Sequence, residues 1–306
     1  MSSTVFQVVD VTKWEVAAFE TAGLEEKLWL IEPATGRRWL YKPVTHHANP
    51  HSKLDPRQGE DWAEKISAEL ARLLSVPAAE VEMASRDGVP GSISLNLKPQ
   101  HWEMQPGTVL VGALDPEYDL TRKGGHVGHT LQNVQRVLRG YAAPPGWPGL
   151  PSEFDAFDTF AGFLVLDAWI ANRDRHSENW AVLRGPGPSD APCLSPSYDH
   201  ASSLGYHLAR SKLEQILASG EVGNFATRKA TAHRYQDGKD ASLVDFAHRA
   251  LARASPKAHQ HWMAQLSKIE KEAWASLVAG TPGMSDVAGM FVVELLEINR
   301  RRLLDA

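Results

Sequence analysis

The sequence predicts an α+β protein with two lobes, a small strand-rich lobe over about residues 1–100 and a larger, mostly helical lobe over about residues 101–306. Three observations support this division. The chain has 306 residues, which is long for one small domain. Strand and turn patterns dominate its first hundred residues. From about Pro106 the pattern changes to charged and glycine-containing loops, including APPGWPGLP at 143–151, and then to helical repeats of apolar residues.

The small lobe is predicted to contain two hairpins and one helix. LWLI (28–31) and RWLYK (38–42) are rich in aromatic and branched residues and flank the turn-forming EPATG. VEMA (81–84) and SISLNL (92–97) flank the turn RDGVPG in the same way. Between the hairpins, a polar loop at 45–59 precedes apolar residues at helical spacing, which end before Pro77 and predict an amphipathic helix packed on the strands. These residues are Trp62, Ile66, Leu70, Leu73 and Leu74.

The larger lobe is predicted to be built on a strongly apolar helix. This helix is expected to open at Pro151-Ser152, because Asp155 follows the serine by three residues in a capping-box arrangement. Its buried face would hold Phe154, Phe157, Phe160 and Leu164. Further apolar repeats from Phe291 to Ile298 precede three arginines, which suits the C-terminal end of a scaffold helix.

Charge and cysteine content exclude several classes of protein. The formal net charge of −5 lacks the basic character typical of nucleic-acid binding, so we expect no nucleic-acid partner for the chain by itself. The single cysteine, Cys193, excludes an intrachain disulfide framework and suits a reducing, cytoplasmic location. The longest apolar stretch, 160–170, contains Asp167 and is too short to cross a bilayer, so no membrane association is expected.

One polar string, NRDRHSENW at 172–180, carries the strongest chemical signal. It follows the apolar helix and precedes the apolar strand AVL, so it lies at the end of an element, as either a solvated turn or a site. Phosphoryl transfer needs a carboxylate to orient the attacking hydroxyl and oxygen ligands for Mg²⁺. Asp174 and Asn179 have this chemistry, at the D-x-x-x-x-N spacing of a protein-kinase catalytic loop.

The order of other charged residues strengthens this interpretation. Downstream, LSPSYDHASS (194–203) places Asp199 just after a short apolar strand, where a second metal ligand belongs. Upstream, Lys42 ends a strand of the small lobe, where its ammonium would neutralise nucleotide phosphates. A lysine, a base, an amide and a carboxylate therefore follow in kinase order across two lobes.

The chain resembles the HipA-like family of bacterial serine/threonine kinases, within the protein-kinase and phosphatidylinositol-kinase-like fold. The resemblance covers most of residues 19–206 and is most specific in FLVLDAWIANRDRHSENWAVL and LSPSYDHASS. It implies a bilobal kinase that binds ATP and Mg²⁺ between its lobes. The roles it implies are these: Asp174 the catalytic base, Asn179 and Asp199 the Mg²⁺ ligands, Lys42 the phosphate-binding lysine, His176 a neighbour of the phosphates, and Asn96 to Lys98 the backbone against the adenine.

Two parts of the resemblance are less regular. The expected phosphate loop, AGLEEK (22–27), has the single glycine Gly23, with Lys27 to offset its two glutamates. For the acidic partner of Lys42, register favours Glu64, whereas Glu69 borders the apolar stripe of the helix and Glu64 lies opposite it. A solvated face also accounts for either glutamate.

The resemblance implies that a protein Ser or Thr hydroxyl accepts the phosphoryl group. It also leaves room for a separate partner, an antitoxin or a counterpart of the N-terminal subdomain that the HipA toxin carries. The alternatives are a phosphoinositide or small-molecule kinase of the same fold and a kinase-shaped binding module without catalysis. The histidines at 46, 47 and 51 indicate a polar loop rather than zinc, and no G-x-S-x-G surrounds Ser202 to suggest a hydrolase.

Overall fold

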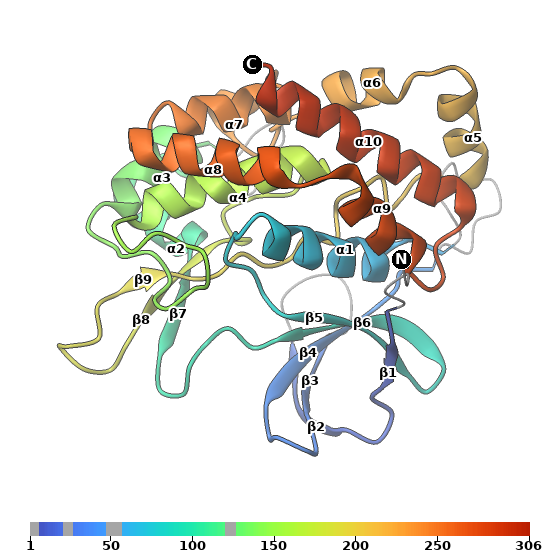
Figure 1. The fold of residues 1–306 in the computed structure, drawn as a ribbon. Helices are drawn as coiled ribbons and strands as arrows, with labels where there is room; N and C mark the ends of the chain where they lie inside the picture. The colour runs from blue at the N-terminus through green and yellow to red at the C-terminus, as the bar shows by residue number, and fades with distance from the viewer. Residues whose placement is uncertain (1–5, 21–26, 47–56, 120–126) are drawn as a thin grey trace.

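The computed structural model describes residues 6–20, 27–46, 57–119 and 127–306, and these form the predicted strand-rich and helical regions (Figure 1). Among the described residues, six strands form the larger sheet in the order β1-β5-β6-β4-β3-β2. β1 pairs in parallel with β5, and the other neighbours pair antiparallel. The strands are β1 (Val8–Asp10), β2 (Glu15–Glu20), β3 (Lys27–Ile31), β4 (Arg38–Pro43), β5 (Val81–Arg86) and β6 (Val89–Leu95).

Both predicted hairpins are present, as β3–β4 and β5–β6. The second turn is tighter than the six residues expected from RDGVPG. It consists of Asp87 and Gly88, whose φ angles of 50° and 78° give the left-handed conformation that matches the twist of paired strands. Strands β1 and β2 precede the first predicted hairpin, in a region for which no individual strand was predicted.

Helix α1 (Glu60–Leu73) lies between the larger sheet and the helical lobe (Figure 1). It packs on β5 and β6 on one side and contacts α4 and α9 on the other. Burial therefore extends around most of the helix, so Glu64 is fully buried although the apolar stripe lies on another face. The expectation of a solvated face is wrong for Glu64, because two layers enclose this helix rather than one.

Helix α4 (Ala156–Ile170) is the centre of the helical lobe, and all of its residues are buried. It starts later than predicted: the N-cap is Asp155, whose side chain accepts a hydrogen bond from the Asp158 backbone N–H. Ser152 therefore does not cap this helix. The expected apolar residues Phe154, Phe157, Phe160 and Leu164 are buried as predicted.

The rest of the helical lobe surrounds α4 and carries a small antiparallel sheet. Within the described residues this sheet has the order β7-β8-β9, formed by β7 (Glu103–Pro106), β8 (Ala181–Arg184) and β9 (Cys193–Leu194). The surrounding helices are α2 (Gly107–Leu114), α3 (Leu131–Leu138), α5 (Arg210–Ala218), α6 (Val222–Asn224), α7 (Leu243–Leu251), α8 (Pro256–Lys268), α9 (Lys271–Ala279) and α10 (Asp286–Leu304). The lobe boundary near residue 100 stays a prediction, and it falls between β6 and β7.

One large apolar core joins α1 to the helices of the larger lobe, and a smaller cluster fills the opposite face of the six-stranded sheet. The α1 helix thus ties the sheet to the helical lobe through shared packing. None of the described helices combines the length and the apolar character needed to cross a bilayer.

Candidate active site

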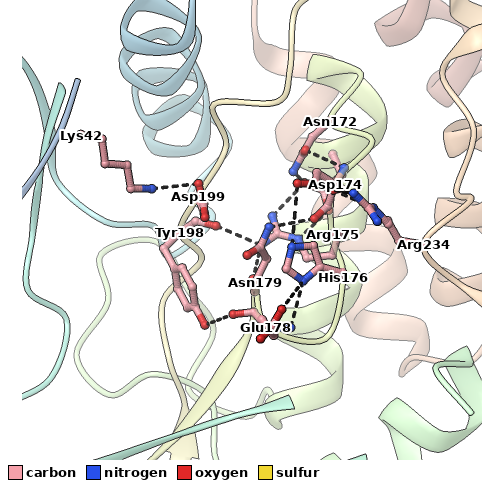
Figure 2. Close-up of polar contacts among 11 residues, drawn as sticks. Lys42, Asn172, Asp174, Arg175, His176, Glu178, Asn179, Tyr198, Asp199 and Arg234 are labelled. Carbon is pink, nitrogen blue, oxygen red and sulfur yellow. Dashed lines mark hydrogen bonds and ion pairs between the residues drawn. The ribbon is translucent and has the colours of Figure 1, made fainter. Parts of the chain in front are cut away.

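The structure brings Lys42 and Asp199 together. Lys42 lies on β4, and its ammonium donates a 2.8 Å hydrogen bond to Asp199 Oδ1 (Figure 2). Burial opposes both charges, but each ion stabilises the other: the pKa of Lys42 is raised, and the Lys42 ammonium holds the pKa of Asp199 well below its usual range. Both groups are therefore charged at neutral pH. Asp199 also has a left-handed φ of 60°, a backbone conformation that is strained for this residue and is typical of functional sites.

The segment 172–180 is held from its buried side by one arginine. Helix α4 ends at Ala171, which has a left-handed φ of 55°, and the chain turns sharply there. Arg175 then reaches back to α4 and donates two hydrogen bonds of 2.8 Å to the carboxylate of Asp167. Asn172 donates a further bond of 2.7 Å to Asp167 Oδ1. Planar, bidentate pairing of this kind fixes orientation as well as distance, so the backbone after α4 has little freedom.

The same guanidinium joins this segment to the one that carries Asp199. Arg175 Nη1 donates to the backbone carbonyl of Asn179 at 2.7 Å and to that of Tyr198 at 3.3 Å. The Tyr198 hydroxyl in turn donates to the Glu178 carbonyl at 2.8 Å. Asn179 and Asp199 are thereby held on adjacent backbone segments, as Figure 2 shows.

Asp174 lies on the partly exposed side of this segment. Its carboxylate is 26% exposed, and the Asn179 side-chain amide donates to its backbone carbonyl at 2.8 Å. Arg234 donates a 2.7 Å hydrogen bond from Nε to Asp174 Oδ1, and its Nη2 forms an ion pair with the same oxygen at 2.5 Å. The second oxygen, Oδ2, lies 3.8 Å from His176 Nε2. An arginine thus anchors one oxygen of the carboxylate, while the other remains available to a substrate.

The donor atoms suit a magnesium ion. Asp199 Oδ1 is bonded to Lys42 and the Asn179 amide nitrogen is bonded to Asp174, while no hydrogen bond among the described residues involves Asp199 Oδ2 or Asn179 Oδ1. A carboxylate oxygen and an amide oxygen on neighbouring segments are hard ligands of the kind that Mg²⁺ prefers. The chemistry of Asn179 and Asp199 therefore fits the ion that the sequence predicts.

A cavity of about 520 Å³ adjoins these groups. Lys42, Tyr198 and Asp199 lie at its polar end, and Leu40, Ala79, Leu95 and Met104 contribute apolar walls. Asn96 and Lys98 also line it, at the place where the sequence predicts contact with an adenine. A mostly apolar cavity with a few charged groups at one end is the usual form of a small-molecule site.

Glu64 lies close enough to Lys42 for each charge to stabilise the other, but no ion pair joins them among the described residues. Within the described part of the chain, Lys42 forms its ion pair with Asp199 and not with Glu64 or Glu69. Glu64 Oε1 instead accepts a 2.9 Å hydrogen bond from the backbone N–H of His200, next to Asp199. Burial raises the pKa of Glu64, but nearby Lys42 and His200 outweigh it and lower the pKa overall. Glu69 pairs with the buried Lys65 and the exposed Arg72.

The remaining predicted site residues differ in how close they lie to Asp174 and Asp199. His176 is half-buried beside Asp174, and burial lowers the pKa of its imidazole below the ordinary value. Lys27 begins β3 and is close enough to lower the pKa of Asp199, although it does not line the cavity. Gly23 and most of the expected phosphate loop lie outside the described residues.

Sequence reasoning missed two arginines. Arg234 reaches Asp174 from 60 residues further along the chain, and Arg173 stands beside Asp174 in the string already singled out. No spacing rule connects position 234 to position 174, since the contact depends on how the chain after α6 folds back. Arg175 belongs to the polar string that the sequence analysis identified. The sequence does not show that its side chain points toward α4.

Solved structures share this architecture. The Helicobacter pylori proinflammatory kinase CtkA matches with a TM-score of 0.76 at 16% identity, over 98% of this chain and 96% of that one. HipA of Shewanella oneidensis MR-1, solved with HipB and operator DNA as a toxin–antitoxin system, matches with a TM-score of 0.58 at 12% identity, over 96% of this chain and 68% of that one. No family model and no curated protein matches the sequence.

These likenesses show the fold: the chain has the two-lobed α+β architecture of HipA-like kinases. The fold class predicted from the sequence is confirmed. At these identities the likeness does not extend to substrates or catalytic residues, which are argued below from the geometry of the cleft.

Proposed function

We propose that the protein is an ATP- and Mg²⁺-dependent kinase that transfers the γ-phosphoryl group of ATP to a Ser or Thr hydroxyl of a protein. The observation that carries the proposal is that Lys42 and Asp199 pair at one end of the cavity, while Arg175 holds the segment of Asp174 and Asn179 beside the one that carries Asp199. Phosphoryl transfer is catalysed mainly by positioning and by neutralising charge, and this set of groups supplies both.

Each residue has a distinct task in this proposal. The cavity takes the nucleotide, with its adenine near Asn96 and Lys98 and its phosphates toward Lys42. Asn179 and Asp199 hold Mg²⁺, which when bound neutralises charge on the phosphate oxygens. Asp174 Oδ2 accepts the proton of the acceptor hydroxyl as that oxygen forms its bond to the γ-phosphorus and the bond to ADP breaks. Arg234 keeps the Asp174 carboxylate oriented through Oδ1.

A partner and a location belong to the same proposal. HipA in the similar complex is bound to HipB and operator DNA, and about a third of that chain has no counterpart here. We therefore expect a separate antitoxin-like protein to bind this kinase, and any nucleic acid to be contacted through that protein. The single Cys193 supports a cytoplasmic location.

The direct test is transfer from labelled ATP with and without Mg²⁺, to proteins of a cell lysate and, in parallel, to phosphoinositide vesicles. Asp174→Asn is expected to lower transfer by about 10²–10⁴-fold while leaving ATP affinity nearly unchanged, because the carboxylate acts on the acceptor rather than on the nucleotide.

Asp305→Asn, an exposed carboxylate at the end of α10, is the matched control and should leave transfer unchanged. Full activity of Asp174→Asn would remove Asp174 from its role, and transfer to lipid alone would replace the protein acceptor. Absence of any Mg²⁺-dependent transfer would refute the kinase.

A further inference from the structure

Arg234 contacts Asp174, and three further basic side chains lie close enough to Arg234 or to one another for their charges to interact. We call Arg173, His207, His233 and Arg234 the acceptor-side cluster. In Figure 2, Arg234 reaches Asp174 from the side opposite Lys42. Arg173 and Arg234 line the same narrow crevice, and the His207 ring packs edge-on against Tyr206 with centroids 5.0 Å apart.

The cluster carries more positive charge than its surroundings balance. Among the described residues, Asp174 is the carboxylate that forms an ion pair with the cluster, through Arg234. Arg173 forms no hydrogen bond or ion pair within the described part of the chain, and its Nε is buried without a partner. Burial lowers the pKa of Arg173, and the neighbouring Arg234 lowers it further. Burial and Arg173 also lower the pKa values of His207 and His233.

An arginine left without an acceptor in this way is costly. A buried donor that lacks a partner loses about 1–3 kcal/mol, and more when it is charged. Two guanidinium groups placed side by side add repulsion. An anion that bound between them would relieve both effects, and a forked guanidinium suits a carboxylate or a phosphate.

The position of the cluster identifies the molecule that would supply this anion. A hydroxyl that gives its proton to Asp174 must lie within about 3 Å of that carboxylate. Arg234 Nη2 lies 2.5 Å from the same carboxylate, on its other oxygen, and is 37% exposed. A group held by Arg234 and Arg173 is thus within one or two residues of the acceptor hydroxyl, on the acceptor chain and not on the nucleotide.

We propose that the acceptor-side cluster is a specificity subsite, which binds an acidic side chain or a phosphoryl group one or two residues from the acceptor Ser or Thr of a protein substrate. This inference rests on the proposed kinase function for the identity of the acceptor. It adds the chemistry that selects among acceptors. Arg173 is the main recognition residue, because Arg234 is already engaged in positioning Asp174.

Binding of short fluorescent peptides to the full chain, followed by anisotropy, tests the subsite without any phosphoryl transfer. The peptides carry a central Ser flanked by Glu, by phosphoserine or by Gln. We expect the Glu and phosphoserine peptides to bind about tenfold more tightly than the Gln peptide, and the advantage to shrink at high salt. The ratio of Glu to phosphoserine affinity identifies which source of negative charge the subsite favours.

Arg173→Gln is expected to reduce the preference to within about twofold, since it removes a charge-assisted bond. Arg173→Lys keeps the charge and should retain most of the preference. Arg139→Gln, at an exposed arginine after α3, is the matched control and should bind like the unchanged chain. Circular dichroism of each variant checks that it is folded.

Equal affinity for the Glu and Gln peptides, or a preference kept by Arg173→Gln, would overturn the subsite. So would tight binding to phosphatidylinositol 4-phosphate vesicles with no peptide preference. If the protein prefers acidic peptides but transfers no phosphate, the subsite is supported and the kinase function is refuted. If it transfers phosphate but has no preference for acidic peptides, the kinase function is supported and the subsite is refuted.

Discussion

The two sides of the segment 172–179 use the same residue types for opposite purposes. On its buried side, Arg175 and Asp167 form a pair in which both side chains are at most 2% exposed, and the other bonds of the arginine go to backbone carbonyls. On its cleft side, Asp174 and Arg234 form a pair that is 26% and 37% exposed. The comparison teaches that burial, and not residue type, separates scaffold from chemistry here. The inner pair should determine stability and the outer groups activity.

The largest effect on stability is expected from the inner pair. Arg175→Met removes one partner and leaves Asp167 charged and buried, so we expect a loss of about 3–5 kcal/mol in the free energy of unfolding. Urea unfolding measures this. Arg139→Gln should change stability by less than about 0.5 kcal/mol. A variant of Arg175 that unfolds within 1 kcal/mol of the unchanged chain would show that the inner pair is not the scaffold.

A smaller loss is expected at Glu64, which lies on α1 and supports the segment of Asp199. Glu64→Ala removes the acceptor of the buried His200 N–H and leaves a small cavity, so a loss of about 2–4 kcal/mol is expected, together with a higher KM for ATP as the Asp199 segment shifts.

Glu69→Ala on the same helix is the matched control. Its side chain is 20% exposed, and the buried Lys65 with which it pairs keeps Glu82 as a second partner, so the substitution should cost less than about 1 kcal/mol and leave the KM unchanged. Equal effects of the two substitutions would remove the distinction between these glutamates.

The smallest effect is a dependence on acid pH. Because the pKa of Asp199 is lower in the folded protein than its usual value near 3.8, the Lys42–Asp199 pair stabilises the fold above that value. This stability is lost as pH falls below about 4 and Asp199 becomes protonated. The difference in unfolding free energy between the unchanged chain and Asp199→Asn should therefore shrink between pH 6 and pH 3. A constant difference would show that the pair contributes nothing to the fold.

Local sequence patterns were sufficient to predict many of the secondary-structure elements and several site residues. The hairpins follow from alternating aromatic and branched residues around turn formers, and α1 and α4 follow from apolar spacing. The polar string after α4 identified Asp174 and Asn179, because eight consecutive polar or charged residues after a buried helix are costly to bury without partners. Asp199 and Lys42 followed from their order along the chain.

Only the tertiary structure decided how these residues meet. In the structure Asp199 forms the ion pair with Lys42, and Glu64 accepts a hydrogen bond from His200. Helix α1 is enclosed on two sides, so Glu64 is buried although the helical wheel places it opposite the apolar stripe. The tertiary structure also brought Arg234 to Asp174 and separated the inward Arg175 from the outward Arg173. The sequence by itself therefore determined the elements and the reactive groups, since both depend on neighbours within a few residues. Pairing of charges depends on the low-dielectric interior formed when distant segments pack, and no local spacing encodes that.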